Sequence, residues 1–157
     1  MKYILIALIL LSTPLFAQES AIVRQYNSDS TLMATGVLTN VTREGLWKYY
    51  NPKTNTLLTE GTFKNGKREG TWSSFYPDGK RKAVAEYRDG ILFGTSKLYD
   101  AEGALKKEMV FKDSVIVGKY IEYFGRTGVP DYIDPNQISI EGQYENSKKT
   151  GQWLQYY

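Results

Sequence analysis

From residue 18 onward, short apolar and aromatic runs alternate with polar turn residues, and the alternation repeats about every 24 residues. Glycines mark the repeat at successive intervals of 25, 24, 24 and 33 residues. The segments between the turns are rich in Thr, Tyr, Phe, Val and Trp, and their lengths are typical of strands. Self-similarity at this period predicts a repeat architecture. The repeat glycines are Gly45, Gly70, Gly94, Gly118 and Gly151.

Aromatic side chains occupy three fixed positions relative to each repeat glycine: seven residues before it, two after it (+2) and five after it (+5). Ser96 departs from this rule at +2, and Leu38 departs from it in the first copy. We interpret the columns as structural, because each unit buries its rings only when the next unit covers them. In sequence order, the columns contain Phe63, Tyr87, Phe111 and Tyr144; Trp47, Trp72, Tyr120 and Trp153; and Tyr50, Phe75, Tyr99, Tyr123 and Tyr156.

A turn dipeptide separates two strands within each unit. Asn and Asp followed by Gly66 or Gly90 suit a tight hairpin turn, which needs two residues with positive φ. Ser114 and Ser147 replace the turn glycine in the later copies. The pattern therefore predicts an all-β fold, an elongated antiparallel meander of hairpin repeats. A degenerate first unit around residues 21–26 precedes the five regular copies.

The +2 and +5 positions differ in parity, so a regular strand would point them to opposite faces of the sheet. Either both faces carry rings, or a β-bulge intervenes.

Residues 61–80, Gly-Thr-Phe-Lys-Asn-Gly-Lys-Arg-Glu-Gly-Thr-Trp-Ser-Ser-Phe-Tyr-Pro-Asp-Gly-Lys, resemble the bacterial MORN-repeat variant family. That family includes exported proteins and proteins described as YwqK-type antitoxins. The resemblance covers about residues 21–157. It implies a single-layer antiparallel sheet and a role in interaction rather than catalysis. Ser96, Ser114, Ser147 and a nine-residue expansion of the last interval depart from the pattern, and Ser96 is expected to interrupt any continuous aromatic surface.

The N-terminus has the parts of a secretory signal peptide: Lys2, an apolar run over residues 3–11, and Ala17 before a polar segment. Cleavage near Ala17 leaves a mature domain over residues 18–157. The alternative is a buried N-terminal strand or helix. The apolar run is too short to span a bilayer, so we expect no transmembrane helix. The signal peptide predicts a periplasmic or secreted location. Because the chain has no cysteine, we expect neither disulfides nor a lipid anchor.

Composition argues against several kinds of chemistry. The net charge of +3 is too small and too evenly mixed to indicate nucleic-acid binding. The chain has no histidine, the commonest general base and metal ligand, and we expect no enzymatic activity, metal or cofactor. Glu60, Glu108 and Glu141 share one position of the repeat. Paired carboxylates would suit a glycosidase, but cross-strand partners for lysine or arginine are the simpler interpretation.

Two segments are candidate binding sites. The first is the inserted loop over residues 125–137, since loops that interrupt a repeat often carry function; a plain surface insertion is the alternative. The second is a basic cluster among aromatic residues, which would suit an acidic partner or simply aid solubility. The candidate residues are Pro130, Asp131, Tyr132 and Asp134 in the loop, and Lys64, Lys67 and Arg68 in the basic cluster.

These observations favour an exported, non-catalytic binding or scaffold module that contacts a protein or an envelope glycan through its sheet. The resemblance raises an antitoxin or immunity-type inhibitor as the alternative. Lipid head-group binding and a carbohydrate-active enzyme remain further alternatives.

Overall fold

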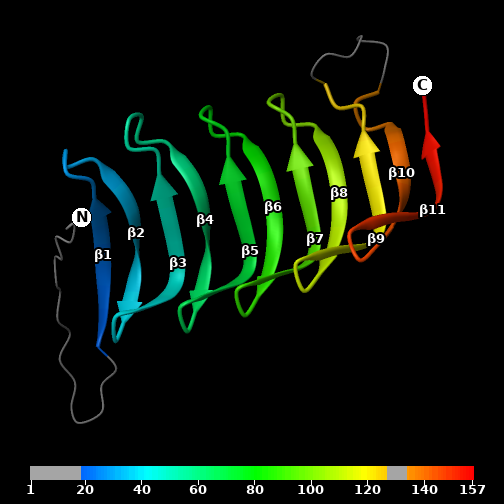
Figure 1. Cartoon of the computed structure of the whole chain (residues 1–157). Coiled ribbons are helices and arrows are strands. Elements are labelled where there is room, and N and C mark those ends of the chain that lie inside the picture. The colour runs from blue at the N-terminus through cyan, green and yellow to red at the C-terminus, as the bar shows by residue number, and fades with distance from the viewer. Residues whose placement is uncertain (1–18, 127–133) are drawn as a thin grey trace.

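The computed structural model describes residues 19–126 and 134–157, and these form one open, antiparallel, 11-stranded sheet (Figure 1). Each strand pairs with its neighbours in sequence, which confirms the predicted meander, and the described residues include no helix. The predicted signal peptide and the loop residues Pro130, Asp131 and Tyr132 lie outside the described residues. The strands are β1 (Ser20–Tyr26), β2 (Leu32–Thr39), β3 (Thr42–Tyr50), β4 (Leu57–Lys64), β5 (Lys67–Phe75), β6 (Arg81–Arg88), β7 (Ile91–Tyr99), β8 (Leu105–Lys112), β9 (Val115–Tyr123), β10 (Ile138–Glu145) and β11 (Lys148–Gln155).

The hairpin turns have the predicted geometry. Asn65 and Gly66 have φ of 51° and 74°, and the corresponding pairs in the other units also have two positive φ values. Such turns match the twist of the flanking strands. In the first hairpin this position is taken by Val41, a β-branched residue with φ of 62° that is 92% exposed. Val41 therefore adopts a strained conformation without gaining burial.

Each repeat glycine lies in a β-bulge of two extra residues. Gly61 on β4 pairs with Trp72 on β5, but its neighbour Thr62 pairs with Glu69, which leaves Gly70 and one further residue unpaired. The same shift recurs at all five repeat glycines, whose φ values lie between 62° and 71°. A left-handed conformation at this point explains why the repeat uses glycine here.

Beyond the bulge, the pairing of β3 with β4 is regular from Gly45 to Tyr49. The Tyr49 ring packs against Trp47 on one face, so Tyr50, the next residue of the strand, points to the opposite face. The first alternative from the sequence therefore holds, since both faces of the sheet carry aromatic residues. The bulge at the repeat glycine lies before the +2 ring and does not separate it from the +5 ring.

Serines in the turn-glycine positions connect neighbouring units. The turn N–H donates to a carbonyl of the preceding unit, as in Gly66 to Arg43 O at 3.0 Å and Ser114 to Leu92 O at 2.9 Å. The Ser114 hydroxyl also accepts a hydrogen bond from the Leu92 N–H at 3.3 Å, and Ser147 does the same for Ile116 at 3.2 Å. Serine lacks the conformational freedom of glycine, but its hydroxyl adds a second hydrogen bond between neighbouring units.

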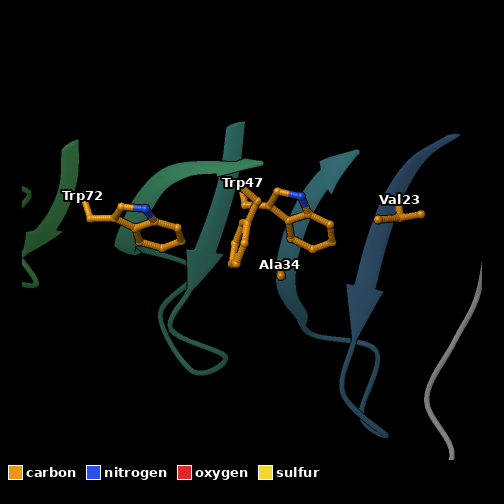
Figure 2. Packing of buried hydrophobic residues seen from close by; sticks show 5 residues of the cluster. Val23, Ala34, Trp47 and Trp72 are labelled. Atoms are coloured by element: carbon orange, nitrogen blue, oxygen red, sulfur yellow. The ribbon is translucent and has the colours of Figure 1, made fainter. Parts of the chain in front are cut away.

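The degenerate first unit is part of the sheet. β1 pairs with β2 along its whole length, and Val23 is only 3% exposed. Val23 belongs to a buried cluster with Ala34, Trp47 and Trp72 (Figure 2). β1 therefore supplies the cover that the first regular unit needs on its outer side.

Candidate functional site

One face of the sheet, the ring face, carries the +2 residues and the aromatic residues seven positions before the repeat glycine. Trp47, Trp72 and Trp153 lie flat over a glycine of the preceding strand. A Cβ added at Gly36 or Gly61 would lie 2.2 Å from Cδ2 of the indole, far inside van der Waals contact. Each indole therefore occupies the space of a side chain that the neighbouring strand lacks.

Sequence reasoning missed this pairing, although the chain carries a signal for it. A glycine stands eleven residues before each tryptophan, namely Gly36, Gly61 and Gly142. Where the +2 residue is Ser96 the corresponding residue is Ala85, and where it is Tyr120 the residue is Met109. The residue that faces the +2 side chain is therefore larger in the two units that lack tryptophan.

A basic side chain lies over the ring of each tryptophan. The guanidinium of Arg43 lies 5.0 Å from the Trp47 ring centroid, that of Arg68 lies 4.4 Å from Trp72, and Lys149 Nζ lies 4.0 Å from Trp153. Cation–π contacts of this kind contribute about 0.5–2 kcal/mol. Each of these basic residues stands two positions before the repeat glycine, and in the two units without tryptophan that position is occupied by Leu92 and Ile116.

The predicted basic cluster therefore divides into two parts. Arg68 belongs to the ring face, where it also donates a hydrogen bond to the Tyr87 hydroxyl at 3.2 Å. Lys64 and Lys67 instead oppose each other beside the hairpin turn, and Lys67 Nζ lies 3.9 Å from Asp89. These two exposed lysines have the character of solvated turn residues.

The ring face consists of two aromatic clusters. The first joins Trp47, Tyr49, Phe63, Trp72 and Tyr87, with ring centroids 5.0–6.4 Å apart. The second joins Tyr120, Tyr144 and Trp153 at 5.3–5.5 Å. Among the described residues no ring-to-ring contact connects them. The break spans β7 and β8. It includes Ser96, which was expected to interrupt the aromatic surface, and Phe111, whose ring belongs to neither cluster.

A hollow of about 210 Å³ lies on the first cluster's side of this break. Its floor includes Ala85, the counterpart of the glycines that indoles cover elsewhere. Ser96 leaves Ala85 uncovered because its short side chain instead donates to the Val84 carbonyl at 3.2 Å. The hollow is therefore a ring position without a ring. It is lined by Thr59, Arg68, Trp72, Ser73, Ser74, Ala83, Ala85 and Tyr87.

On the other side of the break, Lys107, Tyr120 and Glu122 form a hydrogen-bonded group. Lys107 Nζ lies 2.9 Å from Glu122 and 3.2 Å from the Tyr120 hydroxyl, which itself donates to Glu122. Burial alone would raise the pKa of Glu122, but the hydrogen bonds from Tyr120 and Lys107 outweigh it and lower that pKa. The carboxylate is held in its charged form.

The opposite face, the paired-charge face, contains the three carboxylates considered for catalysis. Glu60 lies 3.6 Å from Lys48, Glu108 lies 2.8 Å from Lys97, and Glu141 lies 3.3 Å from Lys119. These contacts agree with the interpretation as cross-strand partners. They are accessible to solvent, so water screens them and each contributes little to the stability of the sheet.

Two +5 tyrosines reinforce these pairs. Tyr156 donates to Glu141 at 2.8 Å, and Tyr123 donates to Glu108 at 3.4 Å. The hydrogen bond from Tyr156, with help from Lys119, lowers the pKa of Glu141.

The base of the inserted loop is fixed by Asp100, a residue that sequence reasoning missed. Asp100 is only 5% exposed, and its carboxylate accepts hydrogen bonds from the backbone N–H groups of Ala104 at 2.7 Å and Arg126 at 2.6 Å. At the other end of the loop, Asp134 accepts a bond from the Asn136 N–H at 2.9 Å. Asp134 thus stabilises a local turn.

Residues 19–126 and 134–157 contain no group of three or more potential metal ligands. Within the same ranges, no helix is long and apolar enough to cross a membrane. Comparison of the chain with protein-family models and with curated proteins finds no match to either.

Proposed function

We propose that this chain is an exported, non-catalytic binding module that contacts a protein or an envelope glycan through its repeat sheet. The observation that carries the proposal is the interruption of the ring face at β7. A continuous array would place a ring over every unit for its own stability. The unit with Ser96 at +2 lacks that ring, and a hollow bounded by Trp72, Tyr87 and Arg68 remains. Concave sites lined by rings and a few polar groups are the usual form of binding sites.

The chemistry of both faces favours binding over catalysis. On the paired-charge face, Glu60, Glu108 and Glu141 each form an ion pair with a lysine, as cross-strand partners in a sheet do. On the ring face, Glu122 is held as an anion by Lys107 and Tyr120.

Export and family membership belong to the same proposal. β1 begins at Ser20, so cleavage near Ala17 would leave every strand of the sheet intact. The recurring pair of strands with a left-handed turn supports membership of the MORN-repeat variant family. Amino-terminal sequencing of the protein recovered from the periplasm or medium tests export. A first residue near Gln18 is expected, and recovery of the intact N-terminus from the cytoplasm would contradict export.

The function is tested by affinity capture from envelope extract with the mature chain, residues 18–157. Two variants serve as comparisons: one replaces residues 126–136 with an Asn-Gly turn, and the other, Ala85→Gly/Ser96→Trp, fills the hollow. We expect a stoichiometric protein or glycan with the mature chain, and its loss with the filled hollow. Loss with the loop variant alone would move the site to the insertion. A captured toxin would establish the antitoxin alternative, and capture of nothing would contradict the proposal.

A further inference from the structure

We infer that the hollow over Ala85 receives an aromatic side chain of a partner protein, with a carboxylate close to that side chain in the partner. The inference rests on the proposed function and assigns the partner's chemistry. An incoming ring would complete the row of rings that the chain itself leaves open at β7.

The shape of the hollow follows from comparison with the other units. Over Gly36 and Gly61 an indole from the next strand fills the equivalent space, and its Nε1 donates to a backbone carbonyl at 3.1 Å. At β6 and β7 the ring is absent, and the glycine is replaced by Ala85. The added methyl raises the floor of the hollow, so a ring attached to β7 at the usual depth would clash with it. A ring from outside the chain has no such attachment and rests on the methyl.

The lining of the hollow matches one aromatic side chain better than a sugar. Ala83 and Ala85 form an apolar floor, and Trp72 and Tyr87 bound it on one side. A volume of about 210 Å³ is below the ~300–1,000 Å³ of most small-molecule sites and suits a single anchoring residue. Interface hot spots are commonly aromatic side chains seated in such recesses.

The positive charge of Arg68 indicates which group should lie beside the partner's aromatic ring. The guanidinium of Arg68 lies at the rim, 4.4 Å from the Trp72 centroid and 5.1 Å from that of Tyr87. Within the parts of the chain that the structure describes, no carboxylate oxygen lies within 4.0 Å of it. A carboxylate next to the partner's aromatic residue would pair with Arg68 while the ring enters the hollow.

The test uses the mature chain labelled with ¹⁵N and three capped tripeptides: Asp-Trp-Asp, Asp-Ala-Asp and Lys-Trp-Lys. We expect Asp-Trp-Asp to shift the amide signals of Trp72, Ala83, Ala85 and Tyr87 with a dissociation constant of roughly 1 mM. Asp-Ala-Asp should bind at least about tenfold more weakly because it lacks the ring, and Lys-Trp-Lys should also bind more weakly because Arg68 repels it.

Variants locate the binding. Ala85→Gly/Ser96→Trp supplies the chain's own ring and should weaken Asp-Trp-Asp at least about tenfold, whereas Ser96→Ala leaves the hollow open and should bind as the parent does. If the double variant does not fold, Ala83→Leu fills the same space from the floor and gives the same comparison.

Three results would overturn the inference: no shifts with Asp-Trp-Asp up to about 10 mM, equal binding by the filled and parent proteins, or shifts at these residues with glucuronate but not with the peptide. If peptide binding fails while affinity capture succeeds, the module binds elsewhere and the proposed function survives without this site.

Discussion

Gly61→Ala tests whether the repeat depends on the close contact between tryptophan and glycine. The new Cβ would lie 2.2 Å from Cδ2 and 2.4 Å from Cε2 of Trp72. Carbon atoms pack at about 3.5–4.0 Å, so the indole must move by more than about 1 Å. That movement weakens the bond from Trp72 Nε1 to Thr62 O and the edge contact with Phe63 at 5.0 Å.

The magnitude follows from opposing terms. Overpacking costs about 1–3 kcal/mol, and the weakened hydrogen bond costs up to about 1 kcal/mol. Replacing glycine by alanine within a strand returns about 0.5–1 kcal/mol of backbone entropy. We therefore expect the free energy of unfolding to fall by about 1–3 kcal/mol, measured by urea denaturation at 25 °C with tryptophan fluorescence and far-ultraviolet circular dichroism. The two signals must coincide for the two-state analysis to hold.

The matched control comes from the chain itself. Tyr120 opposes Met109, so a tyrosine at +2 accommodates a side chain on the preceding strand. In a Trp72→Tyr background, Gly61→Ala should therefore be neutral, or stabilising by about 0.5 kcal/mol. The double-mutant cycle would then give a coupling energy of about 2 kcal/mol. An equal cost in both backgrounds, or a cost below about 0.5 kcal/mol for Gly61→Ala alone, would refute the reasoning.

Three further predictions concern other parts of the sheet. Val41→Gly should raise the free energy of unfolding by about 1–2 kcal/mol in urea titration, because it removes left-handed strain at an exposed position; an equal gain from Val41→Ala would contradict this cause. Asp100→Asn should destabilise by about 1–3 kcal/mol and accelerate hydrogen exchange at the amide of Arg126; unchanged exchange would contradict it. The lowered pKa of Glu122 means that its stabilisation is complete above its ordinary value of 4.5 and is lost as the pH falls through the folded-state value. Glu122→Gln should therefore flatten the acid side of the stability profile, and an unchanged profile would exclude this group.

Much of the candidate site was outside the reach of sequence reasoning. The basic cluster was identified as one feature, yet only Arg68 lies on the ring face, because Lys64 and Lys67 flank a turn that directs them elsewhere. The role of Asp100 at the base of the insertion has no signal in the sequence, since its partners are backbone groups that any residue carries. Asp134 stabilises a turn at the end of the insertion.

The sequence by itself determined the strands, the hairpins and their antiparallel order. These follow from local preferences: Asn65 and Gly66 accept positive φ, and alternating aromatic and β-branched residues favour extended backbone on either side. The period of the pattern then requires neighbouring units to stack, because a single hairpin buries too little apolar surface to remain folded.

Only the tertiary structure decided what each residue in the columns touches. The two-residue bulge at the repeat glycine aims the +2 side chain backward over the preceding strand. Where the preceding strand has a glycine, an indole fills the space above it, and where that strand has Ala85 the space remains as a hollow. These contacts join residues about eleven positions apart across a hydrogen-bonded pair of strands. Their energy depends on distances of a few tenths of an ångström, which the packed sheet fixes and local preference does not.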